Sequence, residues 1–139
     1  MHVRRLHGIS ATGANYYEQD VKTFGSPALE YYRRAAEIVA AAAPDSQAFV
    51  FSDDPAWAQA NLRLPFPMTF VTHNGPYEAH EDLHLMSLCR HFIIANSTLS
   101  WWGAWLGRAA GKIVCAPRAW MTDRDVSGSG LFPPDWKVL

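Results

Sequence analysis

Short apolar runs alternate with longer amphipathic stretches along the chain, and this pattern predicts five strands and four helices. Apolar runs of strand length occur at residues 1–5, 48–51, 68–71, 92–95 and 112–116. Helical spacing of apolar residues occurs between them, at residues 27–43, 57–62, 83–89 and 101–106. Strands that alternate with helices are typical of a parallel sheet. We therefore expect an α/β fold, with a parallel sheet that carries helices on both faces.

The segment from Asp82 to Gly107 organises this prediction. It consists of a helix, a buried strand, a turn rich in small polar residues and a second helix that contains three tryptophans. Ser97 and Thr98 stand directly before the second helix, whose first backbone amides have no partner within the helix. Such a turn is a site for an anion. The alternative is that Ser97 and Thr98 only cap the helix and that the tryptophans belong to the core.

Charged residues follow two other predicted strands. Arg4 and Arg5 end the first strand, and Asp53 follows the second. Right-handed connections would bring the carboxyl ends of the first, second and fourth strands to one edge, together with these side chains and the polar turn. Arginines and amides bind phosphate oxygens, while a carboxylate accepts hydrogen bonds from the N–H groups of guanine. This edge is therefore predicted to bind a purine diphosphate.

Local signals mark the start of two helices. Ser26 and Pro27 are expected as the N-cap and the first residue of the helix that follows the long N-terminal loop. Asp54 is expected to cap the helix that begins at Pro55. That role leaves the neighbouring Asp53 as the better candidate for a binding site.

Composition limits the classes of protein that remain. The 139 residues are 49% hydrophobic and 18% charged, which suits one domain with a substantial core. The net charge of −1 comes from 12 basic and 13 acidic side chains, so no nucleic-acid partner is expected. Cys89 and Cys115 lie in apolar surroundings and are interpreted as reduced core thiols.

Neither a membrane helix nor a signal peptide is predicted. No segment approaches the roughly 20 consecutive apolar residues that a transmembrane helix requires. Residues 1–20 lack the apolar centre of a signal peptide. We therefore expect a cytoplasmic protein, and peripheral association with a membrane stays open.

One motif competes with a diphosphate site. Residues 80–84 read His-Glu-Asp-Leu-His, the HExxH pattern that places two zinc-binding imidazoles one helical turn apart with a glutamate base. No third ligand follows at a spacing typical of zinc hydrolases, and His91 falls on or beside the next strand. The first turn of a solvated helix accounts for the same residues, because its acids favour the helix dipole. A zinc hydrolase is the remote alternative, and no metal site is expected.

Three segments resemble the motifs of the α-1,2-fucosyltransferases, and they occur in the order of that family. They read His2-Val3-Arg4-Arg5, Phe51-Ser52-Asp53-Asp54 and Asn96-Ser97-Thr98-Leu99-Ser100-Trp101-Trp102-Gly103-Ala104-Trp105. The third segment is long and rich in tryptophan, so it is the most specific of the three. The resemblance extends from His2 to about Trp120.

The resemblance implies an inverting, metal-independent enzyme that transfers L-fucose from GDP-β-L-fucose to the 2-hydroxyl of a galactoside. It also implies two Rossmann-like domains in the B-type glycosyltransferase architecture, and this chain resembles the C-terminal, donor-binding half. Arg4 would be the catalytic residue, because it would stabilise the charge on the departing diphosphate. The residues implied for donor binding, in which Asp82 and Asp53 would be the acceptors for guanine, are His2, Arg4, Arg5, Asp53, Asp82, Ser97 and Thr98.

Two features depart from the family pattern. The family motif continues Arg-Arg-Gly-Asp, whereas Leu6 follows Arg5 here, so the aspartate of the motif is missing. Glu18 and Asp20 in the following loop are the candidates to replace it. The chain also begins inside the first motif, so the N-terminal acceptor domain is expected to be absent.

The chain is accordingly predicted to be a single GDP-fucose-binding domain over residues 1–139. Residues 1–25 would form a strand and a long loop, and residues 118–139 an irregular tail. The missing half would leave an apolar face uncovered, on which we expect Trp120, Phe132 and Trp136. Such a face favours a homo-oligomer or a separate chain that supplies the acceptor domain. A catalytically silent module that binds GDP or a GDP-sugar is the alternative.

Overall fold

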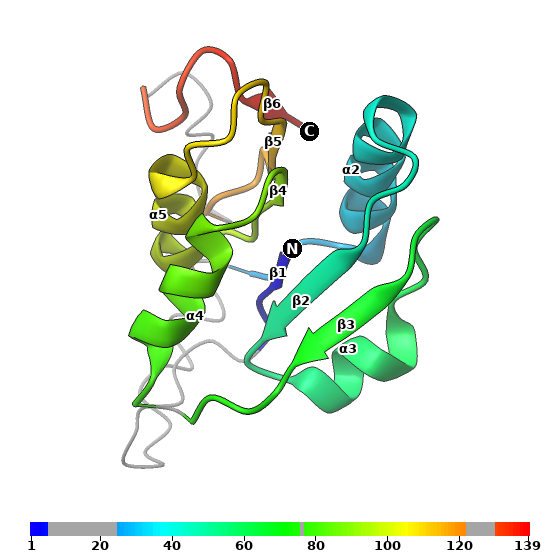
Figure 1. Cartoon of the computed structure of the whole chain (residues 1–139), viewed down its shortest axis with the longest axis vertical. Helices are drawn as coiled ribbons and strands as arrows, with labels where there is room; N and C mark the ends of the chain where they lie inside the picture. The colour runs from blue at the N-terminus through cyan, green and yellow to red at the C-terminus, as the bar shows by residue number, and fades with distance from the viewer. Residues whose placement is uncertain (6–24, 76, 122–129) are drawn as a thin grey trace.

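Helices and strands alternate along the chain (Figure 1). The computed structural model describes residues 1–5, 25–75, 77–121 and 130–139. In chain order, the elements of these residues are β1 (His2–Val3), α2 (Leu29–Ala42), β2 (Ala48–Ser52), α3 (Pro55–Asn61), β3 (Met68–Val71), α4 (Ala79–Ser87), β4 (Phe92–Ile93), α5 (Thr98–Leu106), β5 (Val114–Ala116) and β6 (Lys137–Val138). The α/β class and the four predicted helices are confirmed.

The described strands form two parallel sheets, so the prediction of one sheet is wrong. The first sheet has the order β1-β2-β3 and the second the order β4-β5-β6. β1 and β4 lie at the facing sides of the two sheets and have two residues each. A small cavity lies between them, lined by His2 and Phe51 of the first sheet and by Phe92 of the second. Side chains rather than a backbone ladder therefore join the sheets at this point.

Helix α2 gives the two sheets a common core. One buried cluster combines residues of α2, of the first sheet and of the second sheet, namely Tyr32, Ala35, Val39, Val3, Val50, Ile93 and Cys115. The hydroxyl oxygen of Tyr31 lies 2.6 Å from the backbone oxygen of Ile94 and 2.8 Å from that of Cys115. Both carbonyls belong to the second sheet or its continuation. These contacts therefore attach the second sheet to α2, the helix that also covers the first sheet.

The opposite face of the second sheet packs against α5 and the C-terminal segment. Side chains alternate between the two faces of a strand, and accordingly Ile93 and Cys115 face the α2 cluster while a second cluster contains Phe92, Ile94, Val114, Ala116, Ala104, Trp120 and Trp136. Figure 1 shows the second sheet between α5 and α2. Helices on both faces, as predicted, are thus present in the second sheet.

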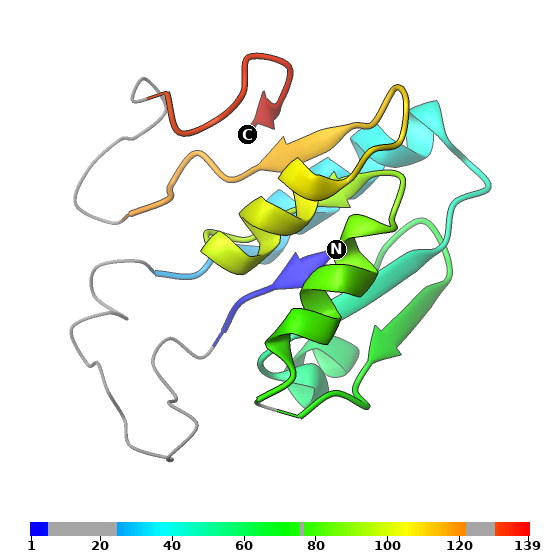
Figure 2. The same cartoon turned by 60° about the vertical axis from the view of Figure 1, so that its left-hand side comes forward.

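The predicted apolar face of Trp120, Phe132 and Trp136 is not found. Trp120 and Trp136 are 8% and 6% exposed, and Phe132 is half-buried against them. Burial is possible because the C-terminal segment folds back beside β5 of the second sheet (Figure 2). Large exposed apolar side chains occur elsewhere among the described residues, at Leu29, Phe49, Tyr77, Leu88, Trp102, Trp105 and Leu106.

The tail contains a strand that the sequence did not predict. Lys137 and Val138 form β6, which pairs parallel with Cys115 and Ala116 of β5. Lys137 and Val138 follow a proline-rich stretch, and two residues are too few to show a strand periodicity. Pairing with β5 therefore decides their conformation.

The expected N-cap at Ser26 is also wrong, because extended backbone at Ala28 delays the start of α2 until Leu29.

Two further predictions concern the thiols and the membrane. Cys89 and Cys115 are both free, Cys115 fully buried and Cys89 half-buried. Among the described residues, no helix has both the length and the apolar character needed to cross a membrane.

Candidate functional site

Arg4 and Asp53 meet where β1 and β2 end. β1 and β2 are neighbouring parallel strands, with Val3 opposite Ser52, so the residues that follow them lie side by side. The Nε atom of Arg4 lies 3.2 Å from Oδ2 of Asp53, and the backbone N–H of Arg5 donates to Oδ1 of Asp53 at 2.8 Å. The predicted convergence of Arg4, Arg5 and Asp53 at one strand edge is therefore confirmed.

The side chain of Arg5 lies on an aromatic ring. Its guanidinium carbon is 4.0 Å from the ring centroid of Trp57, in the first turn of α3. The sequence pattern alone does not indicate Trp57. Its position four residues after Asp53, just inside a helix capped by Asp54, is the signal that could have indicated it.

Two buried side chains lie beneath this edge. Tyr32 of α2 is 1% exposed, and burial raises the pKa of its hydroxyl far above the ordinary value, with a further contribution from the charge of Asp53. His2 is 5% exposed. Burial lowers the pKa of His2 to about 3, and the positive charges of Arg4 and the terminal amine act in the same direction. His2 is therefore a neutral imidazole at physiological pH, and its predicted contact with a nucleotide stays a prediction.

The predicted anion turn lies at the amino end of α5. Ser97 occupies the N-cap position, as predicted, but its side chain makes no capping hydrogen bond. Its backbone oxygen accepts from the N–H of Trp101 at 3.0 Å. Thr98 is exposed at the first helical position. The hydroxyl of Ser97 is thus not used to cap α5, which weakens the interpretation of this turn as a cap only.

Asn96 fixes the turn that precedes α5. Its side-chain nitrogen donates to the backbone oxygen of Gly25 at 3.2 Å and to that of Trp120 at 3.3 Å. The hydroxyl of Ser100 donates to the backbone oxygen of Ala95 at 3.2 Å. These bonds tie the amino end of α5 to the start of the α2 segment and to the C-terminal segment.

Asp82 belongs to a separate group of contacts. It lies in the first turn of α4, and its Oδ1 accepts from the side-chain amide of Asn74 at 2.7 Å. The N–H of Gly75 donates to the carboxylate of Glu78 at 2.6 Å, which closes the same loop. A role of Asp82 toward guanine stays a prediction.

The structure therefore brings together only part of the predicted site. Arg4, Arg5 and Asp53 are in direct contact, whereas none of the interactions of the described residues joins Ser97 or Thr98 to the two arginines. Ser97 and Thr98 follow β4, which belongs to the second sheet. Glu18 and Asp20, the candidates to replace the missing aspartate, lie outside the described residues.

The HExxH segment forms part of α4. His80 and His84 are exposed, and His80 lies 3.5 Å from the neighbouring Glu81. Within the described parts of the chain, no group of three His, Cys, Asp or Glu side chains is arranged to hold a metal ion. The described fold therefore brings no third zinc ligand to the two histidines of the HExxH segment.

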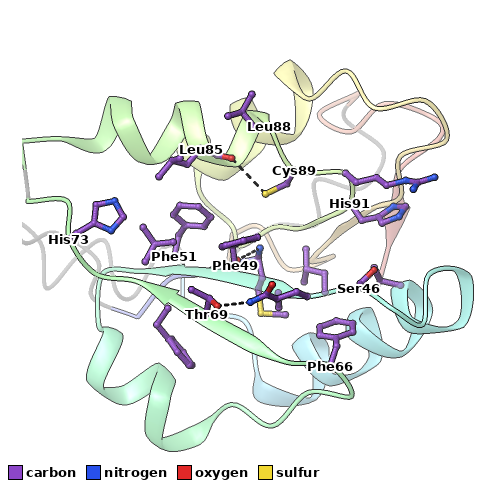
Figure 3. A pocket seen from close by; sticks show the side chains of 18 residues that line it. Ser46, Phe49, Phe51, Phe66, Thr69, His73, Leu85, Leu88, Cys89 and His91 are labelled. Atoms are coloured by element: carbon purple, nitrogen blue, oxygen red, sulfur yellow. Dashed lines mark hydrogen bonds between the residues drawn. The ribbon is translucent and has the colours of Figure 1, made fainter.

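A large apolar groove lies away from the arginine pair. It has a volume of about 610 Å³ and lies between the first sheet and the carboxyl end of α4 (Figure 3). Its lining includes Phe49, Phe51 and Thr69 of the first sheet and Leu85, Leu88 and Cys89 at the end of α4. None of the predicted donor-binding residues lines it. The groove is thus distinct from the candidate site at the strand edge.

Comparison with known proteins identifies the family. A family model described as Glycosyl transferase family 11 matches residues 18–139. The chain belongs to this family. Membership confirms the resemblance to the α-1,2-fucosyltransferases and carries it to the end of the chain, past Trp120. The matched range includes the second and third motifs and begins after His2–Arg5.

Two bacterial relatives support the assignment to family 11. The chain is 37% identical over 128 residues to the O-antigen biosynthesis glycosyltransferase WbnK of Escherichia coli, which covers 91% of this chain and 40% of that protein. It is 35% identical over 92 residues to an alpha-1,2-colitosyltransferase of Escherichia coli, which covers 63% of this chain and 31% of that protein. The chain therefore spans less than half the length of these relatives. No solved structure matches it.

Proposed function

We propose that this chain is the donor-binding part of a family 11 enzyme that transfers L-fucose from GDP-β-L-fucose to the 2-hydroxyl of a galactoside. The observation that carries the proposal is the cluster of Arg4, Arg5 and Asp53 at the carboxyl ends of β1 and β2. Two guanidinium groups and one carboxylate leave a net positive charge there. Such an edge suits the diphosphate of a nucleotide sugar.

The reaction would proceed with inversion at the anomeric carbon. The 2-hydroxyl oxygen of the acceptor attacks that carbon while its bond to the β-phosphate oxygen breaks, so negative charge develops on the departing GDP. Arg4 would stabilise this charge, and the hydroxyls of Ser97 and Thr98, together with the first backbone amides of α5, would hold phosphate oxygens. These groups supply the stabilisation without a metal ion or a cofactor. The proton of the acceptor hydroxyl passes to a general base.

The remaining predicted residues would orient the nucleotide. Arg5 would present its guanidinium to the diphosphate, and the buried His2 would support the first motif beneath it. Asp82 is the better acceptor for guanine, because among the described residues only its Oδ1 has a partner, the amide of Asn74, whereas both carboxylate oxygens of Asp53 have one. We propose a Rossmann-like domain in a B-type architecture, with an acceptor-binding half on the other side of the cleft. That half would come from the same polypeptide, from a second copy of the chain or from a separate chain.

A second donor sugar is favoured by one relative. The alpha-1,2-colitosyltransferase is 35% identical to this chain, and colitose is L-fucose without the 3-hydroxyl. GDP-colitose would use the same diphosphate and guanine contacts. Competition between the two donors separates these alternatives, because a site that hydrogen-bonds the 3-hydroxyl discriminates strongly against the sugar that lacks it.

Calorimetry tests the donor site directly. GDP is titrated into the purified chain in the presence of a chelator, and the titration is repeated with Arg4→Ala. The matched control is Arg108→Ala, which removes an exposed arginine just after α5. We expect metal-free binding in the micromolar range that Arg4→Ala abolishes and Arg108→Ala leaves unchanged. Absence of binding at millimolar GDP would contradict the proposed donor site.

Transfer activity requires a second assay. The chain is incubated with GDP-fucose and lactose, alone and with a candidate acceptor-binding half, and the linkage of the product is read by NMR. An α-1,2 linkage supports fucosyl transfer, and Arg4→Ala is expected to raise the barrier by on the order of 3 kcal/mol, or about 10²-fold in rate. GDP binding without transfer under every condition would favour the catalytically silent module.

A further inference from the structure

The guanidinium of Arg5 is held in an unusual way. It lies with its central carbon 4.0 Å from the ring centroid of Trp57. Its Nε atom is buried and has no hydrogen-bond partner among the described residues. Arg4, by contrast, is paired with the carboxylate of Asp53. Of the two adjacent arginines, one is therefore oriented by an acid and the other by an aromatic face.

Trp57 is itself fixed by the turn between β2 and α3. Its backbone N–H donates to Oδ1 of Asp54 at 3.1 Å, and the backbone N–H of Asp54 donates to the hydroxyl oxygen of Ser52 at 3.0 Å. Asp53 in the same turn binds the backbone of Arg5. The turn thus holds Arg5 at two points, its main chain through a carboxylate and its side chain through an indole.

An aromatic face orients a cation without cancelling its charge. A carboxylate in the place of Trp57 would form an ion pair with Arg5 and reduce the cluster to zero net charge, whereas the ring quadrupole attracts the guanidinium and leaves its formal charge intact. The N–H groups at the rim of a stacked guanidinium also stay free to donate to phosphate oxygens. A diphosphate at this edge would therefore meet an oriented cation that is not neutralised.

We propose that Trp57 is a positioning residue for the donor diphosphate, acting through Arg5. This inference rests on the proposed function, because it assumes that the diphosphate of the nucleotide sugar binds at the edge formed by β1 and β2. Trp57 itself is not expected to touch the reacting atoms. Its effect on binding should therefore disappear when Arg5 is removed.

A double-mutant cycle on GDP binding tests this coupling. GDP affinity is measured by calorimetry for the unsubstituted chain, Trp57→Met, Arg5→Ala and the double variant. Trp57→Met retains an apolar side chain against the core, and we expect it to weaken GDP binding about 5-fold, in the range of a partly desolvated cation–π contact. Trp57→Phe retains a ring and should restore most of the affinity. In the Arg5→Ala background, Trp57→Met should change the affinity less than 2-fold, roughly the limit of additivity for independent sites.

Controls separate positioning from folding. Trp105→Met replaces another half-exposed tryptophan, which stacks on Trp101 in α5, and should leave GDP affinity unchanged. Thermal unfolding of every variant identifies any that are not folded, and Trp57→Leu then replaces Trp57→Met in the comparison with Arg5→Ala. An equal loss of affinity from Trp57→Met with and without Arg5 would overturn the inference while leaving the donor site in place. Failure of the unsubstituted chain to bind GDP would overturn the proposed function and this inference together.

Discussion

The carboxylate of Asp53 holds Arg4 and Arg5 at once, because Oδ2 lies 3.2 Å from the Nε of Arg4 while Oδ1 accepts the backbone N–H of Arg5 at 2.8 Å. The pair is partly exposed, with 32% of the Arg4 side chain and 22% of the Asp53 side chain accessible. Solvent therefore weakens its contribution to stability. The geometric effect is larger, since one side chain sets the position of two consecutive cations.

Substitution of Asp53 should separate the ion pair from the hydrogen bond. Asp53→Asn retains an acceptor for the N–H of Arg5 and should lower the free energy of unfolding by about 0.5 kcal/mol. Asp53→Ala loses both contacts and should cost about 2 kcal/mol. Urea denaturation measures both values. Asp135→Ala, at an exposed acid near β6, is the control and should have little effect, and equal losses for the two Asp53 variants would contradict this account.

The sequence predicts local elements well where an apolar run is bounded by polar or proline residues. The strand at residues 68–71 has the predicted bounds, and the strand at Ala48 ends one residue later than predicted. The contact between Arg4 and Asp53 also follows from the alternation of strands and helices, because consecutive strands joined by one helix usually pair. Asp54 caps α3 as predicted.

The features that were missed depend on distant partners. β6 becomes a strand because β5 offers a free edge, and the two sheets stay separate because β1 and β4 do not pair, with a small cavity between them. Similarly, the apolar periodicity of the α3 segment gives no information about which cation lies on the ring of Trp57. Pairing across the chain, rather than local pattern, decides each of these features.

The buried His2 should make stability depend on pH. Its folded pKa of about 3 lies below the ordinary pKa of 6.5 for a histidine, so the fold favours the neutral form. This contribution is fully present above pH 6.5 and is lost as pH falls toward 3. Between pH 7 and pH 5 the free energy of unfolding should fall by about 2 kcal/mol from this group alone.

Comparison of two histidine variants isolates this effect. His2→Phe removes the buried titratable group and should reduce the loss of stability between pH 7 and pH 5, measured by urea denaturation at each pH. His84→Gln replaces an exposed histidine of α4 and should retain the full dependence. The same slope in His2→Phe as in the unsubstituted chain would show that other groups cause it.

Lys112 closes the carboxyl end of α5. Its Nζ donates to the backbone oxygens of Ala104 at 2.7 Å and Gly107 at 2.8 Å. A cation there satisfies free carbonyls and interacts favourably with the helix dipole. Lys112→Met should lower the free energy of unfolding by about 1–2 kcal/mol. Lys137→Met, at an exposed lysine of β6, is the matched control, and similar losses for both variants would argue against a capping role.

The close packing of Gly107 against Phe92 should make this glycine irreplaceable for a steric reason. A Cβ atom at residue 107 would collide with the ring of Phe92, approaching its Cε2 to 2.8 Å. The backbone of Gly107, with φ of −60° and ψ of 125°, is open to any residue, so conformational strain plays no part. Gly107→Ala should therefore lower the free energy of unfolding by about 1–3 kcal/mol.

A smaller side chain at residue 92 should relieve the collision. In a Phe92→Leu background, Gly107→Ala should cost less than it does alone, because the ring atoms that it meets are gone. Gly111→Ala is the contrasting case, since its Cβ would meet open space while its φ of +67° strains any other residue. Its cost should be the same with Phe92 and with Leu at that position. Chemical denaturation of the single and double variants measures both couplings, and a cost of Gly107→Ala that is independent of residue 92 would exclude the steric explanation.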